Sequence, residues 1–304
     1  MQSGMSFRNS SKNLSRWSIM IVSFHPCFDA DIQIVLGSRS PDAGDMDLIS
    51  RAEAVILPQA CPEELMRFCS RSETQVFPDY RLRFEYPGKI GQSRLFEQLG
   101  FPCPETRCWS TVAQFKKSYP GPDQFPHRLP FFVKDDRTHE AEGVFFIKNS
   151  SHLRGALEYL QRRERSGFPG FLTQACIPSD GNILRGVIIG RDIHTFWKRP
   201  TQAGQVITTV SRGARIDHDW HPELQERGRV QVQALAAKTG INLAAVDLVF
   251  SLSEQSPQPF FLEINYYFGR RGLGGSERYY QLLFGAIKDW LKKKGLNSAS
   301  VQLV

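Results

Sequence analysis

Oxygen-bearing side chains interrupt two apolar segments late in the chain. The segment Val246–Phe250 carries Asp247, and the segment Phe260–Asn265 carries Glu263 and Asn265. Because successive side chains of a β-strand point to opposite faces, Glu263 and Asn265 are expected on one face. If the two segments pair, Asp247 can face them across the ladder. Carboxylate and amide oxygens suit Mg²⁺ or Mn²⁺, so these three residues are predicted metal ligands.

Each of these residues also has a simpler interpretation. An acidic side chain at alternate positions of a strand is often just exposed to solvent, and Asp247 taken alone favours that interpretation. A buried carboxylate without a partner is costly. The three residues together, on two apolar segments, therefore favour a metal site.

Short apolar segments in the first third of the chain end at prolines and alternate with one helical pattern. Such an alternation predicts a small parallel α/β domain. The expected strands and helix cover residues 18–24, 32–36, 54–57, 61–70 (helix) and 76–77.

The rest of the chain alternates between helical and extended patterns. Residues 88–100 are expected to form a helix with Gly100 as its C-cap, and two prolines force residues 101–106 to be extended. A later helix is expected to begin at Ser150 or Ser151 as N-cap. The further expected helices span 151–163, 222–239 and 276–295, and the expected strands span 130–134, 143–148, 171–177, 184–189, 192–198, 206–210, 246–250 and 259–264.

The overall composition limits the classes of function and partner that can be expected. The chain has 304 residues, of which 41% are hydrophobic, which is enough for a substantial core in two or three subdomains. The net charge of +7 comes from scattered basic residues, and no aromatic–basic motif for nucleic acid is present. No apolar run approaches the roughly 20 residues needed to cross a bilayer. Nucleic-acid and membrane partners are therefore not expected.

Six cysteines are present without a Cys-x-x-Cys pair or a His/Cys cluster at zinc spacing. This usage predicts reduced, mostly buried thiols in a cytoplasmic protein. Residues 1–17 are Ser-rich and basic, and the apolar stretch Ile19–Phe24 is shorter than a signal-peptide core of roughly 7–15 residues. We therefore expect a disordered leader over residues 1–17.

The order of motifs over residues 88–295 resembles the ATP-grasp superfamily, in particular its glutathione-synthetase/RimK-like branch. The motifs that carry this resemblance are Lys89, Phe131-Phe132-Val133-Lys134, Phe171–Ile177, Leu184–Gly190 with Arg185, Trp197-Lys198-Arg199, the set Asp247, Glu263 and Asn265, and Phe268–Gly272. The resemblance implies a small parallel α/β N-terminal (pre-ATP-grasp) domain followed by a two-lobed ATP-grasp fold. The implied parts are a substrate-side domain (18–87), a small lobe with helix linker and hinge (88–177) and a C-terminal lobe with the metal site (178–304).

The resemblance also assigns roles to single residues. Two lysines would contact the nucleotide phosphates, a hinge strand would contact adenine through its backbone, and two arginines would clamp a phosphate or acyl phosphate with forked donors. Asp180 is the candidate for the ribose hydroxyls, and the first residue of an Asp-Gly turn is an equal interpretation. The predicted catalytic residues are Arg185 and Arg199, and the predicted nucleotide-binding residues are Lys89, Lys134, Gly143, Gln174, Ala175, Cys176, Ile177 and Asp180.

Three features depart from the family pattern. The segment before Gly143 should be a glycine-rich flap over the phosphates, yet it is acidic. Ala175 stands where the family has an acidic residue after the hinge glutamine, and the family's additional asparagine is not evident near Thr209, Ser211 and Arg212. The acidic residues of the flap segment are Asp135, Asp136, Glu140 and Glu142.

The resemblance implies an ATP- and magnesium-dependent ligase that activates a carboxylate as an acyl phosphate and joins it to an amine or similar nucleophile. The carboxylate would belong to a small molecule or a peptide. A kinase acting on a hydroxyl keeps the same fold, and a non-catalytic nucleotide-binding module is suggested by the glycine-poor flap. Dimers are common in the family, so the resemblance allows a homodimer.

Overall fold

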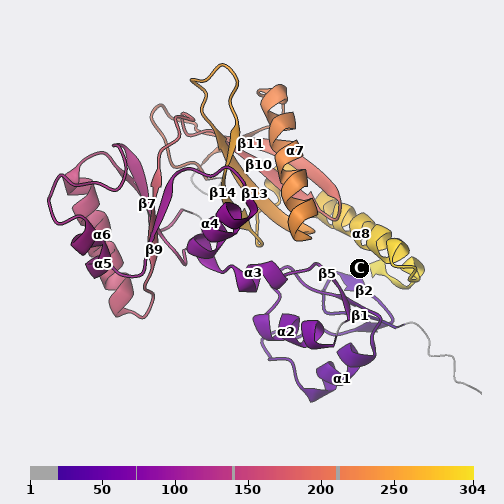
Figure 1. Cartoon of the computed structure of the whole chain (residues 1–304). Coiled ribbons are helices and arrows are strands. Elements are labelled where there is room, and N and C mark those ends of the chain that lie inside the picture. Colours follow the sequence, from indigo (N-terminus) through magenta and orange to yellow (C-terminus); the bar gives the residue numbers. More distant parts are fainter. Residues whose placement is uncertain (1–19, 73, 139–140, 210–212) are drawn as a thin grey trace, which may run out of the picture.

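The computed structural model describes residues 20–304 except 73, 139–140 and 210–212, so the expected leader over 1–17 lies outside the described residues. The architecture is mixed α/β, with one parallel sheet and three antiparallel sheets (Figure 1). This agrees with the fold class expected from the sequence. Among the described residues, no helix has the length and apolar character needed to cross a membrane.

The first sheet is parallel, with the strand order β3-β1-β4-β5. All residues of its two central strands are buried, as expected for parallel strands covered on both faces. The carboxyl ends of its strands lie at one edge, which is where ligands bind in open α/β sheets. The elements of this part are β1 (Ile21–Ser23), β2 (Phe28–Asp29), β3 (Ile32–Gln33), α1 (Ala43–Arg51), β4 (Ala54–Ile56), α2 (Glu63–Arg71), β5 (Gln75–Phe77) and α3 (Arg81–Glu85).

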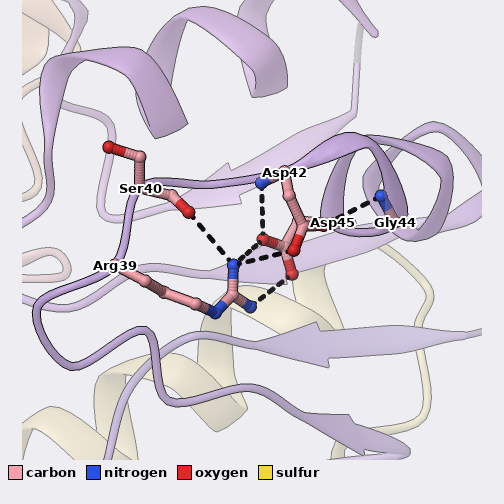
Figure 2. Close-up of polar contacts among 5 residues, drawn as sticks. All are labelled: Arg39, Ser40, Asp42, Gly44 and Asp45. Carbon is pink, nitrogen blue, oxygen red and sulfur yellow. Dashed lines mark hydrogen bonds and ion pairs between the residues drawn. The ribbon is translucent and has the colours of Figure 1, made fainter.

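The start of α1 shows how a polar cluster fixes a helix that the sequence patterns did not predict. The Asp42 side chain accepts hydrogen bonds from the backbone N–H groups of Gly44 and Asp45, and the Asp45 side chain accepts one from the Asp42 backbone N–H (Figure 2). Arg39 donates to the Asp45 carboxylate at 2.9 Å, and Asp45 is only 4% exposed. This capping box satisfies free N–H groups of the first turn, so the loop before α1 is tied to the helix.

The second part is an antiparallel sheet with strand order β6-β9-β7-β8 and two helices against it. The helix α6 begins after Asn149, whose side chain accepts from the His152 backbone N–H, so the expected N-cap at Ser150 or Ser151 was wrong by one or two residues. The expected Gly100 cap of α4 is confirmed by its left-handed conformation, φ 71°. The elements are α4 (Gly88–Leu99), β6 (Thr106–Trp109), α5 (Val112–Ser118), β7 (Phe131–Asp135), β8 (Val144–Ile147), α6 (Ser150–Arg165) and β9 (Phe171–Ala175).

The third part is a five-stranded antiparallel sheet with strand order β12-β11-β10-β13-β14. Every residue of the inner strand β13 is buried, because α7 covers one face of the sheet and α8 covers the other (Figure 1). The helix α8 also packs on the N-terminal sheet, so the parts share core residues. The elements are β10 (Ile183–Ile189), β11 (Asp192–Arg199), β12 (Arg215–Asp217), α7 (Pro222–Thr239), β13 (Leu243–Phe250), β14 (Pro259–Asn265), η2 (Arg271–Leu273), α8 (Ser276–Lys293), η3 (Ser298–Ser300) and β15 (Gln302–Leu303).

The expected strand over residues 206–210 was wrong. Residues 206–209 form no strand, and Val210 lies outside the described residues. The place beside β11 is taken by β12, where Ile216 pairs with Lys198 of β11, so residues 206–209 do not extend the ladder at that position. The division of the chain after residues 87 and 177 stays a prediction.

Candidate active site

A cavity of about 1650 Å³ lies where the three main sheets meet. This exceeds the roughly 300–1,000 Å³ of a typical small-molecule pocket, so it has room for more than one ligand. Its wall combines the loop after β4, the first residues of α4, the ends of β7 and β9, the inner strands of the third sheet and the loop after β14. All of the sequence-predicted site residues line it except Gly143 and Arg199.

Two lysines enter the cavity from the second part of the chain. Lys134 on β7 donates to Gln174 Oε1 at 2.6 Å, and burial lowers its pKa from the ordinary 10.5 to about 8. Lys89 in the first turn of α4 donates to the Asp135 carbonyl at 3.0 Å and the Thr138 carbonyl at 2.5 Å, and burial lowers its pKa as well. Neither lysine has an ion-pair partner among the described residues, so both charges remain available to an anion.

The predicted hinge follows directly from β9. Gln174, Ala175, Cys176 and Ile177 all line the cavity, and the Ala175 N–H donates to the Glu105 carbonyl at 2.9 Å. Burial raises the pKa of the Cys176 thiol, so this cysteine is an unreactive wall residue rather than a nucleophile. The roles of these residues toward adenine stay predictions.

Asp180 lines the cavity and also forms the turn that was its alternative interpretation. Its φ is 49° and that of Gly181 is 74°, so the pair occupies left-handed conformations, which glycine adopts freely and aspartate tolerates. Asp180 is exposed. A turn residue whose carboxylate faces solvent at the cavity rim is compatible with binding hydroxyls, and that role stays a prediction.

Asp247 is buried at the centre of the cavity and bound by two cations. Arg185 donates to both carboxylate oxygens at 2.8 Å, and Lys198 donates to one of them at 2.7 Å. Burial alone would raise the pKa of Asp247, but the charges of Arg185 and Lys198 hold it well below its usual range. Arg185 and Lys198 both line the cavity beside Asp247, and cations at this point suit a phosphoryl group.

Lys198 was not singled out in the sequence, although it belongs to one of the quoted motifs. Because neighbouring residues of a strand point to opposite faces, Lys198 and Arg199 cannot both face the cavity. Lys198 faces it, whereas Arg199 donates to Asp217 at 2.9 Å and stacks on the Trp220 ring at 4.1 Å. Only Arg185 of the two predicted arginines is therefore brought to the cavity, and a catalytic role of Arg199 stays a prediction.

Glu263 and Asn265 lie on the same face of β14, as strand alternation predicted. The Asn265 side-chain NH₂ group donates to Glu263 Oε1 at 3.0 Å, so the Asn265 side-chain oxygen takes no part in this hydrogen bond. Glu263 pairs with Asp247 across the β13–β14 ladder, next to a bulge between Asp247 and Leu248. The predicted metal ligands are thus neighbours in the structure.

The donor set fits a hard divalent cation. The described residues contain no group of three or more His, Cys, Asp or Glu side chains that could hold a metal on its own. Mg²⁺, however, usually takes one or two protein carboxylates and completes its shell with phosphate oxygens and water. Glu263, the Asn265 oxygen and the remaining lone pair of Asp247 are donors of that kind.

The acidic flap segment has a structural explanation. Asp135 is 1% exposed and pairs with Arg163 at 2.8 Å, and Asp136 accepts from the Ile90 N–H at 2.7 Å. Asp135 is therefore held by the protein rather than directed at a phosphate, whereas Asp136 lines the cavity and pairs with Arg137 at 3.0 Å. Gly143 has φ 62°, and a Cβ there would lie 2.7 Å from the Asp135 Cβ, so this position requires glycine for backbone reasons. His139 and Glu140 lie outside the described residues.

The cavity extends past the metal ligands to a second end that the sequence analysis did not assign. Gln59 and Arg83 reach it from the N-terminal part, and Arg270 and Arg271 reach it from the loop after β14. Arg270 and Arg271 belong to the motif Phe268–Gly272 quoted for the resemblance, and no pattern in the sequence pointed to Gln59 or Arg83.

Comparison with known proteins gives a match by structure and none by sequence. No protein-family model matches the chain, and no curated protein sequence matches it. A RimK-domain ATP-grasp protein from Sphaerobacter thermophilus has 16% sequence identity and a TM-score of 0.56, with 80% of this chain and 82% of that chain covered. The VanG D-Ala:D-Ser ligase from Enterococcus faecalis has 14% identity and a TM-score of 0.54, covering 78% and 72%.

A third solved structure, D-cycloserine synthetase DcsG, has 19% identity and a TM-score of 0.51, covering 83% of this chain and 87% of that chain. At these identities the likeness concerns the fold. The chain has the ATP-grasp fold, as the resemblance in the sequence led us to expect.

Proposed function

We propose that this protein is an ADP-forming, ATP- and Mg²⁺-dependent ligase that joins a carboxylate to an amine or similar nucleophile. The observation that carries the proposal is one cavity that holds two lysines without acidic partners together with Glu263, Asn265 and the Arg185–Asp247–Lys198 cluster. The similar structures that are ligases support the reaction class.

The lysine end of the cavity would bind ATP. The nucleotide carries several negative charges, and Lys89 and Lys134 would neutralise part of them as point charges. Because both lysines already sit in a partly dehydrated wall, their attraction to phosphate is stronger than it would be in water. The segment from Gln174 to Ile177 would hold the base at this end.

A metal ion would be held between the phosphates and the β13–β14 pair. Glu263 and Asn265 would bind it directly, and Asp247 would contribute a remaining lone pair. When bound, Mg²⁺ or Mn²⁺ would reduce the charge that builds up on the transferred phosphoryl group.

The chemistry would run in two steps. A carboxylate oxygen of the substrate attacks the γ-phosphorus of ATP, the bond from γ-phosphorus to ADP breaks, and an acyl phosphate forms. The amine nitrogen then attacks the acyl carbon, inorganic phosphate leaves, and the nitrogen loses a proton. Arg185 and Lys198 would stabilise the transferred group, and the walls of the cavity would keep water from hydrolysing the acyl phosphate.

The setting and co-substrates are part of the proposal. All six cysteines are free thiols, which supports a reducing compartment such as the cytoplasm. The cavity volume supports a small molecule or the end of a peptide as the carboxylate substrate, beside the nucleotide.

Calorimetric titration tests the nucleotide site. ATP and ADP would be titrated into the purified protein with and without Mg²⁺, in parallel with Glu263→Ala and with Glu254→Ala as an exposed control. We expect magnesium-dependent binding that Glu263→Ala removes and Glu254→Ala retains. Binding in none of these conditions would overturn the proposal, and ADP release with a phosphorylated hydroxyl product would replace the ligase with a kinase.

A further inference from the structure

Two arginines face the cavity from opposite walls at the end beyond the metal ligands. Arg83 belongs to α3 of the N-terminal part, and Arg270 immediately precedes η2 in the loop after β14. Neither guanidinium has a carboxylate within ion-pair distance in the part of the chain that the structure describes. Both guanidiniums are half-buried in the cavity wall, so their charges are available to an anionic ligand.

Arg83 is held in place by aromatic rings and by backbone. Its guanidinium carbon lies 5.1 Å from the Phe84 ring centroid and 5.7 Å from that of Tyr80. The same guanidinium donates to the carbonyls of Gln59 and Cys61 at 3.5 and 3.3 Å. These carbonyls belong to the loop after β4, at the carboxyl edge of the parallel sheet, where ligands of open α/β sheets bind.

Arg270 is held in the same way from the other wall. Its guanidinium carbon lies 4.6 Å from the Tyr279 ring centroid and 4.5 Å from that of Tyr280. Burial and the Arg270 charge lower the pKa of the nearby His25 to about 4, so that histidine is neutral at pH 7. Stacking on two rings orients the Arg270 guanidinium and leaves its charge available to a ligand, since no carboxylate of the described residues forms an ion pair with it.

Gln59 joins the two walls and has an unused acceptor. It is 5% exposed and its side-chain amide donates to the Tyr266 carbonyl at 3.3 Å, directly after Asn265 in the chain. Its Oε1 has no hydrogen-bond partner in the described structure. This hydrogen bond places the end of the cavity lined by Arg83 and Arg270 beside the predicted metal ligands. A molecule bound to the two arginines can therefore reach the reacting centre.

The electrostatic balance at this end is positive. Glu63 is the acidic residue that lines it, and that carboxylate pairs with Arg67 at 2.6 Å. Arg271 adds a third guanidinium from the same loop as Arg270. Forked guanidinium donors match the planar oxygens of carboxylate and the oxygens of phosphate, and they do so better than lysine does.

We propose that Arg83 and Arg270 form a receptor for a non-reacting anionic group, a carboxylate or a phosphate, on one of the co-substrates. The inference rests on the proposed ligase function, and it narrows the substrate class to molecules with a second anionic group. One arginine comes from each wall, so this group would draw the N-terminal part and the loop after β14 together around the substrate.

Small probes test the receptor in the whole protein. Glutarate, 3-phosphonopropionate and butyrate would be titrated by calorimetry in the presence of Mg²⁺ and ADP, with the wild type, Arg83→Met, Arg270→Met and the double variant. Methionine keeps most of the apolar stem and removes the charge. Arg81→Met, on the same helix but outside the cavity wall, is the matched control, and thermal unfolding checks that each variant is folded.

We expect at least one dianion to bind about tenfold or more tightly than butyrate, and each single substitution to weaken it roughly tenfold. Arg81→Met should leave the affinity unchanged. Preference for glutarate assigns the group as carboxylate, and preference for 3-phosphonopropionate assigns it as phosphate. Equal binding of all three probes, or unchanged binding in the double variant, would overturn the inference.

The same samples separate this inference from the proposed function. ATP affinity with Mg²⁺ should be unchanged in Arg83→Met and Arg270→Met, because the lysine end is intact. Failure of the wild type to bind ATP would overturn the ligase proposal while an arginine-dependent dianion affinity still supported the receptor. If Arg270→Met does not fold, Arg270→Lys retains the charge but not the fork, and an unchanged affinity in it and in Arg83→Met would overturn the receptor.

Discussion

Two acidic pairs lie near the cavity, and they serve different purposes. Asp135 ends β7 and Asp136 follows it, and Asp247 and Glu263 face each other across β13 and β14. From the sequence, the second pair was predicted to bind a metal, and the first was noted as acid in the segment that would cover the phosphates. The structure distinguishes them by what each carboxylate touches.

Asp135 of the first pair is bound by a group that builds the fold, because it pairs with Arg163 of α6. Asp136 accepts from the Ile90 N–H in the first turn of α4 and also pairs with Arg137 at 3.0 Å at the cavity wall, so the structural role is clearest for Asp135. The second pair is surrounded by other residues that line the cavity: Arg185 and Lys198 around Asp247, and Asn265 at Glu263. A buried acid paired with scaffold groups has a structural role, whereas an acid whose partners also face the cavity remains available to a ligand.

The strongest test of this difference is Glu263→Gln. The variant keeps the shape of the side chain and removes a charge that would hold the metal ion. We expect ATP-dependent turnover to fall roughly a thousandfold, because a metal ion contributes several kcal/mol to charge stabilisation. The midpoint of thermal unfolding should stay within about 2 °C of the wild type. Glu254→Gln, in the exposed turn between the same strands, is the control, and full turnover in Glu263→Gln would contradict the metal assignment.

The opposite result is expected for Asp135→Asn. Removing the charge weakens the buried contact with Arg163, so the free energy of unfolding measured in urea should fall by about 2–3 kcal/mol. ATP affinity measured at low temperature, where the variant is folded, should stay within about twofold of the wild type. A large loss of ATP affinity without loss of stability would show that Asp135 acts on the nucleotide, and the two pairs would then not differ in role.

Elements with strong local signals could be predicted from the sequence. The helix α7 spans Pro222–Thr239 as expected, because proline at its first position and Gly240 after its end mark both boundaries. The expected strand at 206–210 had β-branched residues, but the place beside β11 is taken by β12, and that pairing is a property of the whole sheet. Local β-propensity therefore fails to predict a strand where pairing with residues distant in the sequence determines whether it forms.

The same difference between local and long-range signals applies to the candidate site. Alternation along one strand placed Glu263 and Asn265 together without any knowledge of the fold. The partners of Asp247 come from residues 62 and 49 positions earlier, on strands that pair with β13 or lie beyond its neighbour. Which of Lys198 and Arg199 faces the cavity depends on strand register, which the sequence of β11 alone does not specify.

Lys134→Met tests a cation of the cavity in the same way as the two preceding variants test its carboxylates. ATP affinity should fall about tenfold or more, because a charged hydrogen-bond donor is lost. The free energy of unfolding at pH 7 should rise by about 1 kcal/mol, because the folded state no longer holds a partly dehydrated charge. Lys148→Met is a matched control, since Lys148 stacks on Phe146 much as Lys134 stacks on Phe132, at 5.5 and 5.6 Å. Loss of both affinity and stability would instead assign Lys134 a structural role.

The smallest expected effect is the pH dependence of nucleotide binding. Burial lowers the pKa of Lys134 to about 8, so about 90% of this lysine is neutral at pH 9 in the nucleotide-free protein. ATP binding requires the charged form, and the dissociation constant should therefore rise roughly fivefold to tenfold between pH 7 and pH 9.

Stability should move in the opposite direction over the same range. The unfolded chain keeps the Lys134 proton up to the ordinary pKa of 10.5, whereas the folded chain loses it near 8. The unfolded state thus binds more protons between these values, and the free energy of unfolding gains from this group as pH rises. Lys134→Met should remove this contribution and flatten the ATP titration above pH 8. An unchanged pH profile in the variant would mean that another group, Lys89 first, controls the charge of the nucleotide end.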